Sequence, residues 1–361
     1  MKILMLAPYS SPIVQRLSKA LEKYGKHDVW IASFNEETDL NKKLLGLGKL
    51  DSYMDYLKFH KVNEIIKKIN PDVVHAHIVN HYGLLAIFQK KPLLVALWGS
   101  DVMLAPNKGS VFRKKFFEFI NLLVINRANM LHTSSEHILD EIVNKYGQNL
   151  RKKVKVFYWG FPVEAPSEFE YKKIELRFLK DCGIKKNDQL IISPRGVASI
   201  YNPEGVIKIV NKLSDIDSFK IVILRGFSTD TDVEKFNLNL GHLKDKIIFI
   251  NRLLSSEELY YLYSLTKYHI SIPVSDALGG GVVEPILRGS FPILSCIPPY
   301  QAFLKENRGY ILEDYSDKSL AKLCLEIEHN NLKNTNSTLE SRYSAESIVK
   351  RFSKLYESIF K

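Results

Sequence analysis

A repeated alternation between short aliphatic or β-branched runs and longer amphipathic stretches constrains the fold of this chain more than any other feature. Such alternation is typical of βα units around a parallel sheet. The first half predicts strands at Ile3–Leu6, Val29–Ala32, Val73–Ala76, Leu93–Leu97, Met130–Thr133 and Val154–Phe157. The second half predicts strands at Leu190–Ser193, Lys220–Arg225, Ile247–Asn251, Tyr268–Ile272 and Phe291–Leu294. Helical spacing of apolar residues lies between them, at Pro12–Tyr24, Asn63–Ile69, Glu136–Tyr146, Ser256–Ser264 and Ala345–Phe360.

The alternation is interrupted once, where prolines in 161–167 are followed by the charged run Glu168–Lys173 without a clear period. A chain of 361 residues also exceeds the ~250–300 residues at which single cores stop growing. We therefore predict an α/β protein with two Rossmann-like domains that face each other across a cleft. The first domain, which would bind the acceptor, would span residues 1–162. Residues 163–185 would form a linker and the start of the second domain, and residues 186–344 would form the donor-binding domain. Residues 345–361 would form a C-terminal helix that packs back on the first domain.

Composition narrows the class of protein. No apolar run approaches the ~18 residues of a membrane span, and Met1–Ala7 is too short for a signal peptide, so we expect a cytoplasmic protein. Cys182, Cys296 and Cys324 form no C-x2-C pair, which argues against a disulfide framework or zinc site and favours three buried thiols. A net charge of +11 favours an anionic partner. The charge is spread out and no nucleic-acid-binding motif accompanies it, so we do not expect nucleic acid as a partner.

The segment from Ile270 to Gly289 carries the most specific chemistry. A strand ends, Asp276 follows, three glycines (279–281) remove side chains, and a helix is predicted to begin near Val283 with Pro285 in its first turn. Bare amides at a helix start can bind a phosphate or diphosphate, and Glu284 could accept hydrogen bonds from a vicinal diol. The structural alternative is a capped helix with a flexible turn.

Asp276 and Glu284 are separated by seven residues and followed by PILRGSFPILS. This block resembles the E-x7-E motif and the following segment of the retaining family 4 glycosyltransferases, which have the GT-B fold. Other segments resemble that family in the same order: Met1–Pro8 its first strand, Pro71–His77 (PDVVHAH) a later strand, Leu97–Val102 a "WGSD" variant of its "HGxD" loop, Tyr158–Gly160 its "PNG" position, and Ser193–Arg195 its donor-phosphate arginine. The resemblance covers essentially the whole chain.

The resemblance implies roles for single residues. Glu284 would hold the nucleotide ribose, and Asp276 would contact the donor sugar. The donor diphosphate would be received by Arg195, by the amides of Gly280, Gly281 and Val282, and by Ser11. Arg252 and Leu253 would lie beside the base. Catalytic contacts would come from Asp276, His77 and Asp101. The family needs no metal, and the sequence offers no D-x-D site, so we expect neither metal nor cofactor.

Three departures from the family pattern are evident. The first carboxylate is Asp276 where Glu is usual, which shortens its reach toward the sugar. The lysine expected some five residues after Arg195 is absent, and Arg225, Arg252 or Arg288 could replace its charge. Trp98 stands in place of the loop histidine, so Asp101, His77 or the backbone would have to supply that contact.

The acceptor side is expected near Ser10, Tyr82 and Trp98, with His75, His77 and His81 at the end of the third predicted strand. Among the histidines we favour His77, which is nearest the strand end, although strand histidines are commonly packed core residues.

Basic and aromatic residues lie together in residues 111–129, including Arg113, Lys114 and Lys115 beside Phe112 and Phe116. This pattern fits either an anionic membrane surface or a core helix with a solvated basic turn.

We therefore predict transfer of a hexose or amino-hexose from a nucleotide diphosphate sugar, UDP-linked, to a saccharide or lipid-linked saccharide hydroxyl, with retention. The resemblance places this activity in bacterial-type surface polysaccharide or glycan assembly, on the inner face of the cell membrane. A nucleotide-sugar epimerase of the same fold and a non-catalytic nucleotide-sugar-binding protein are the alternatives.

Overall fold

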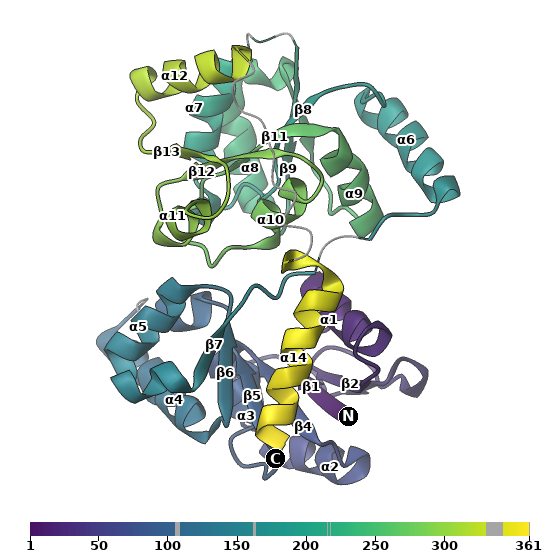
Figure 1. Cartoon of the computed structure of the whole chain (residues 1–361), viewed down its shortest axis with the longest axis vertical. Helices are drawn as coiled ribbons and strands as arrows, with labels where there is room; N and C mark the ends of the chain where they lie inside the picture. The colour runs from purple at the N-terminus through teal and green to yellow at the C-terminus, as the bar shows by residue number, and fades with distance from the viewer. Residues whose placement is uncertain (105–108, 162–163, 215, 217, 330–341, 361) are drawn as a thin grey trace. The chain divides into compact units, whose positions relative to one another are not determined.

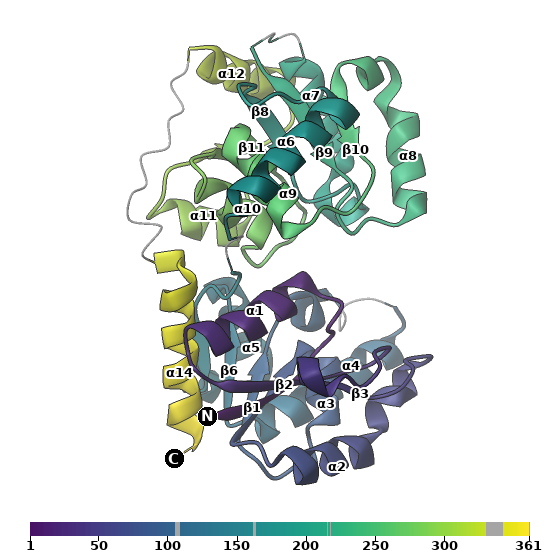
Figure 2. The same cartoon turned by 90° about the vertical axis from the view of Figure 1, so that its right-hand side faces the viewer.

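A computed structural model describes residues 1–104, 109–161, 164–214, 216, 218–329 and 342–360. Contacts divide the chain into two compact units, Met1–Phe161 with Ser341–Lys361, and Pro162–Glu340 (Figures 1 and 2). Each unit is an α/β layer structure around one parallel sheet, as predicted. The predicted domain boundary at 162–163 lies outside the described residues.

The sheet of the first unit has seven parallel strands in the order β3-β2-β1-β4-β5-β6-β7. Their bounds are β1 Lys2–Leu6, β2 Asp28–Ser33, β3 Leu44–Gly46, β4 Val73–His77, β5 Leu93–Ala96, β6 Met130–Thr133 and β7 Val154–Val156. The α-helices are α1 Pro12–Lys23, α2 Phe59–Ile69, α3 Gly83–Leu85, α4 Val111–Arg127, α5 Glu136–Tyr146 and α14 Ala345–Phe360. Short turns of helix lie at η1 Leu40–Lys42, η2 Tyr53–Leu57, η3 Ile78–Tyr82, η4 Ser100–Leu104 and η6 Gln148–Lys152.

The sheet of the second unit has six parallel strands in the order β10-β9-β8-β11-β12-β13. Their bounds are β8 Leu190–Ser193, β9 Lys220–Leu224, β10 Ile247–Ile250, β11 Thr266–Ser271, β12 Phe291–Ser295 and β13 Tyr310–Leu312. The helices are α6 Glu168–Cys182, η7 Ser199–Tyr201, α7 Pro203–Leu213, α8 Asp230–Leu240, η8 Gly241–Asp245, α9 Ser256–Leu265, α10 Gly280–Ile286, α11 Pro298–Leu304 and α12 Asp317–Glu328.

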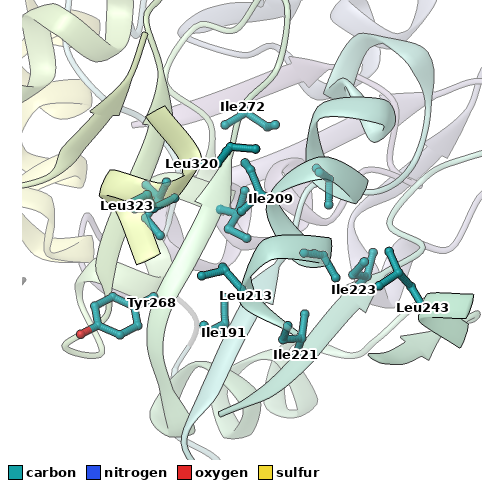
Figure 3. Packing of buried hydrophobic residues seen from close by; sticks show 14 of the residues in the cluster. Ile191, Ile209, Leu213, Ile221, Ile223, Leu243, Tyr268, Ile272, Leu320 and Leu323 are labelled. Atoms are coloured by element: carbon teal, nitrogen blue, oxygen red, sulfur yellow. The ribbon is translucent and has the colours of Figure 1, made fainter. Parts of the chain in front are cut away.

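Aliphatic side chains from strands and helices fill the core between the second sheet and one of its helical layers (Figure 3). Ile191 and Ile223 on the strands meet Ile209 and Leu213 on α7 and Leu320 on α12, all of them buried. Because both faces of this sheet are covered, its strands are apolar runs without polar alternation, which is the pattern that predicts a parallel sheet.

Sequence patterns missed or misplaced several elements. The strands β3 and β13 have three residues each and lie at the sheet edges, so they offer too short a run to recognise. The charged run that we assigned to the linker begins helix α6, which buries only Ile174 and Phe178 and is capped by a Ser167–Glu170 capping box. Cys296 is exposed, so the expectation of three buried thiols was wrong.

Helix α14 packs on the first unit, beside α1 in both views of the molecule (Figures 1 and 2). Its apolar side includes Phe352 and Tyr356, both fully buried. The Phe352 ring lies 4.9 Å from the His132 ring and 5.0 Å from the Phe157 ring. The last residues of the chain therefore complete the core that the first residues begin.

We expect Phe352→Ala to lower the stability of the first unit by about 3–5 kcal/mol, because it opens a cavity under α14. The control Phe360→Ala removes a half-exposed ring from the same helix and should change stability by less than ~0.5 kcal/mol. Urea unfolding followed by tryptophan fluorescence tests this, since Trp30, Trp98 and Trp159, the three tryptophans of the chain, belong to the first unit. Equal midpoints for the two variants would show that α14 does not stabilise that core.

Candidate functional site

The candidate donor site lies where the strand order of the second sheet reverses. Strands β8 and β11 are parallel neighbours, and the chain leaves them for opposite sides of the sheet. Open α/β sheets bind ligands at such a switch point, beyond the carboxyl ends of the strands. Arg195 follows β8 and Asp276 follows β11, so the fold brings together two residues that are 81 positions apart.

Asp276 is surrounded by hydrogen-bond donors. Its Oδ1 is 2.8 Å from Nη2 of Arg195, and its Oδ2 accepts from the Gly279 amide at 3.0 Å and from the Tyr300 hydroxyl at 2.8 Å. The side chains of Arg195 and Asp276 are only 15% and 9% exposed. Burial raises the pKa of Asp276, but the Arg195 charge and these hydrogen bonds outweigh it, and the net pKa lies below its usual value.

The same pair keeps Arg195 charged. Burial lowers the pKa of Arg195, yet the facing Asp276 carboxylate has the larger combined effect and raises the pKa above its ordinary value. The guanidinium also lies 5.1 Å from the centre of the Tyr201 ring. A fixed, mostly buried positive charge is thus held at the end of β8.

The glycine run makes room for two of these side chains. A Cβ on Gly279 would lie 2.1 Å from Nη1 of Arg195, and a Cβ on Gly281 would lie 2.5 Å from its Cδ. A Cβ on Gly280 would meet Oε1 of Glu284 at 2.7 Å. The glycines therefore let Arg195 lie across the start of α10, with Glu284 buried in the same short helix.

Helix α10 begins earlier than predicted. Gly279 is its N-cap, and Pro285 lies near its end, not in its first turn as we had predicted. The Val282 amide donates to the Gly279 carbonyl at 3.0 Å. Gly280 and Gly281 are the first two helical residues, whose amides have no acceptor within a helix, so they are the better placed of the three predicted amides to meet an anion.

Tyr300 and Tyr201 are site residues that sequence reasoning missed. Tyr300 lies on α11 and is fully buried, and its hydroxyl bonds Asp276 and, at 2.9 Å, Ser271. Neither tyrosine belongs to a motif with fixed spacing to Asp276. Only the three-dimensional arrangement of η7 and α11 brings them to the pair.

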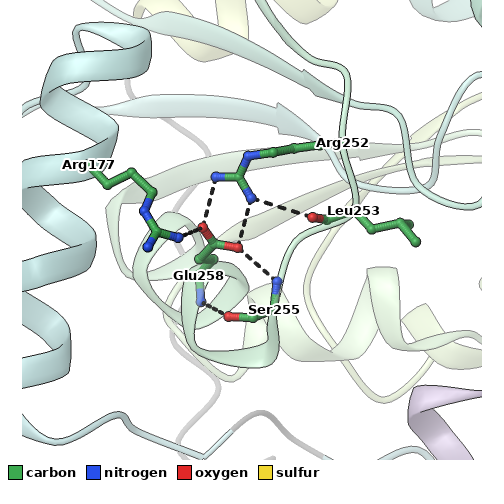
Figure 4. Close-up of polar contacts among 5 residues, drawn as sticks. All are labelled: Arg177, Arg252, Leu253, Ser255 and Glu258. Carbon is green, nitrogen blue, oxygen red and sulfur yellow. Dashed lines mark hydrogen bonds and ion pairs between the residues drawn. The ribbon is translucent and has the colours of Figure 1, made fainter.

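Arg252, expected beside the base, is held by a carboxylate. Its Nη1 and Nη2 bond the two oxygens of Glu258 at 2.9 and 2.8 Å, and Arg177 bonds the same carboxylate at 3.0 Å (Figure 4). Leu253 follows it and is 57% exposed. This pair of contacts stabilises the turn before α9, and its role toward the base stays a prediction.

Three arginines were candidates for the charge of the absent lysine. Arg252 is committed to Glu258, and Arg288 lies over the Tyr260 ring at 4.4 Å. Arg225 directly follows the neighbouring strand β9, and its guanidinium bonds the Ser228 carbonyl and the exposed Asp230. Arg225 is thus the candidate that comes from the strand next to β8.

In the first unit, three buried histidines share one face of the sheet. His75 bonds Nε2 of His132 at 3.1 Å and the Tyr356 hydroxyl of α14 at 2.9 Å. His77, the histidine that we favoured, accepts from Trp98 Nε1 at 3.3 Å, and its Nε2 is buried without a hydrogen-bond partner among the described residues. His75 is therefore a core residue, whereas His77 retains an unused ring nitrogen.

Asp101 anchors the loops at this end of the first sheet. Its two oxygens accept from the backbone amides of Val79 at 2.9 Å and Trp98 at 3.1 Å, and its carbonyl accepts from the side chains of Asn80 and Asn121. Burial raises its pKa, although the backbone amides oppose that shift. Asp101 thus holds the neighbouring loops in position, and its catalytic contact stays a prediction.

The other predicted first-unit residues are divided between surface and core. Ser10 is exposed and Ser11 is the N-cap of α1, at the end of β1. Tyr82 is buried, and its hydroxyl accepts from the Phe34 amide at 3.3 Å, so its place beside the acceptor stays a prediction. Ile78, directly after His77, has φ of +68°, a strained conformation for a β-branched residue of the kind that gathers at functional sites.

No group of His, Cys, Asp and Glu side chains in the described part of the chain is arranged to hold a metal ion.

Comparison with known proteins finds a family match and several similar proteins. The model of the glycosyl transferase 4-like family matches residues 2–135. Among curated proteins, the alpha-monoglucosyldiacylglycerol synthase of Streptococcus pneumoniae is 22% identical over 331 residues, covering 87% of this chain and 73% of that protein. Among solved structures, HepE of Anabaena in complex with UDP and glucose has a TM-score of 0.75 at 14% identity, covering 99% of this chain and all of that one. The UDP-GlcNAc 2-epimerase of Methanocaldococcus jannaschii has a TM-score of 0.64 at 17% identity, covering 99% of this chain and all of that one.

The structural likenesses show the GT-B fold, two Rossmann-like sheets in one chain. The match of residues 2–135 shows that the first part of this chain is similar to the glycosyl transferase 4-like family.

The buried histidines predict a pH-dependent first unit. Burial lowers the pKa of His75 and His132 well below 6.5 and that of His77 to about 3. In the unfolded chain these rings bind protons below pH ~6.5, so the stability that they contribute is complete above that pH and is lost as the pH falls toward 3. Each histidine should lower stability by up to roughly 1.4 kcal/mol per pH unit in that range.

Urea midpoints measured by tryptophan fluorescence between pH 7 and 5 test this expectation. His132→Asn should reduce the slope of stability against pH, whereas the control His60→Asn, at an exposed position of the first unit, should leave it unchanged. A wild-type midpoint that stays constant from pH 7 to 5 would contradict the expectation.

Proposed function

We propose that this enzyme transfers a hexose from a UDP-linked donor to a hydroxyl group of a lipid or saccharide acceptor, with retention of the anomeric configuration. The observation that carries the proposal is the buried Arg195–Asp276 pair laid across the glycine turn that begins α10. The structural likeness to HepE bound to UDP and glucose supports the choice of donor.

The chemistry of the pair suits this reaction. When the glycosidic bond breaks, the departing diphosphate gains negative charge. A fixed arginine and two free amides stabilise that charge without reorganising during the reaction, and they act more strongly on the transition state than on the substrate. Glu284, buried one helical turn away, would accept hydrogen bonds from the ribose hydroxyls.

Replacing the arginine tests the donor site. We expect Arg195→Ala to lower kcat for sugar transfer from UDP-glucose by roughly 10²–10³-fold, and Glu284→Ala to weaken UDP binding. Arg308→Ala, at an exposed position of the second unit, is the matched control. A thermal-shift panel of UDP, GDP, ADP and their sugars, with and without EDTA, identifies the base, since a bound ligand raises the melting temperature. The proposal falls if none of these nucleotides raises it.

An acceptor requirement distinguishes transfer from epimerisation, since the epimerase of M. jannaschii has a similar fold. A transferase consumes UDP-hexose only slowly without acceptor, whereas an epimerase converts it without one.

We propose further that the acceptor is reached at an anionic membrane surface through helix α4. Phe112, Phe116, Phe119 and Leu123 recur at helical spacing on its outer side and are 88%, 49%, 58% and 39% exposed. Its opposite side is buried, at Phe117, Ile120 and Val124. No helix in the described ranges is long and apolar enough to cross a membrane.

The charge of α4 supports an anionic membrane as the surface that its outer face meets. Arg113, Lys114 and Lys115 lie within the first turns of α4, and basic residues near an anionic leaflet contribute roughly 1 kcal/mol each. The likeness to a diacylglycerol-glycosylating enzyme supports a lipid acceptor.

Vesicle co-sedimentation tests the membrane contact. The protein should bind phosphatidylcholine vesicles that contain phosphatidylglycerol, and bind less at high salt. Replacing Phe112, Phe116 and Phe119 by Ser should lower binding about tenfold or more, whereas Phe169→Ser, which removes a 78% exposed ring from α6, should not. Equal binding of both variants would contradict this assignment.

A further inference from the structure

We infer that Asp276 is a positioning residue for Arg195 and, with Tyr300, sets the geometry of the diphosphate site, instead of contacting the donor sugar. The inference rests on the proposed function. It gives Asp276 a role in positioning Arg195, whereas the motif implies a contact with the donor sugar. It is carried by the hydrogen bonds of one buried carboxylate.

Most of the acceptor capacity of Asp276 is used within the protein. A carboxylate has about four lone-pair positions. Asp276 accepts from Arg195 on Oδ1 and from the Gly279 amide and the Tyr300 hydroxyl on Oδ2. With three donors in place and its side chain only 9% exposed, Asp276 offers little of its carboxylate to a sugar hydroxyl.

The direction of the Tyr300 bonds follows from chemistry. An ionised carboxylate only accepts hydrogen bonds, so the Tyr300 hydroxyl donates to Asp276, and Ser271 must then donate to the Tyr300 oxygen. Ser271 is the last residue of β11, and Tyr300 lies on α11. The chain of bonds from Ser271 through Tyr300 to Asp276 therefore connects the sheet to the carboxylate.

The short side chain of Asp276 suits its role in positioning Arg195. Asp276 is tied to the Gly279 amide three residues on, while it reaches the guanidinium that crosses Gly279 and Gly281. One carboxylate thus fixes both the glycine turn and the arginine that lies over it. Removing its charge or its Tyr300 donor should misplace Arg195 relative to the amides of Gly280 and Gly281.

Ligands that lack the sugar test the inference. Dissociation constants would be measured for UDP-glucose, UDP and uridine with the wild type, Asp276→Asn and Tyr300→Phe. We expect both variants to weaken UDP and UDP-glucose by the same factor, about tenfold for Asp276→Asn and several-fold for Tyr300→Phe, and to leave uridine unchanged. Turnover should fall in parallel, with kcat for transfer reduced even at saturating UDP-glucose.

Tyr268→Phe is the matched control, because Tyr268 is buried in the same unit and its hydroxyl has no hydrogen-bond partner among the described residues. It should change none of the three affinities. Weaker binding of UDP-glucose alone would show that Asp276 contacts the sugar and would overturn the inference. Weaker uridine binding would show a general structural defect and would overturn it too. If the wild type binds no uridine nucleotide, the proposed function itself falls.

Discussion

The candidate site of the second unit depends on the mostly buried charge of Arg195. The Arg195 side chain is 15% exposed, and a charge so removed from water is stable only when it is paired. Asp276 supplies the partner, and the donors around Asp276 tie it to the glycine turn and to α11. The glycines are then a steric requirement, since a side chain at Gly279 or Gly281 would collide with Arg195. The glycine turn, the start of α10 and Tyr300 together keep the Arg195 guanidinium charged and fixed.

The first unit is organised by neutral groups. His75, His77 and His132 are buried with lowered pKa values. Trp98 packs edge to face with His77 at 6.0 Å between ring centres, and Trp159 with His132 at 5.7 Å. Asp101 orders the loops through backbone amides. The two units thus differ in chemistry, with a fixed positive charge in one and buried neutral rings in the other, as the proposed transfer from an anionic donor to a hydroxyl group would require.

Sequence patterns predicted the long, buried strands and the amphipathic helices well, because burial on both faces leaves a strong apolar signal. They missed β3 and β13, which are edge strands of three residues. Motif spacing located Arg195, Asp276 and the glycines. It could not show that Asp276 is filled by internal donors, since Tyr300 reaches it from α11 across 24 positions, nor that Tyr82 is a core residue. A sequence motif identifies side chains that lie in one loop. Hydrogen-bond partners that come from other helices or strands depend on tertiary packing, which the motif does not contain.

The return of α14 makes the second unit an insertion within the first. Residues 1–161 lack the helix that covers His75 and Phe157 until the last residues of the chain are available. During synthesis, the second unit can fold as soon as residue 340 has left the ribosome, whereas the unit that begins the chain is completed last. A premature stop near the C-terminus would therefore damage the N-terminal half and leave the charged site of the other half formed.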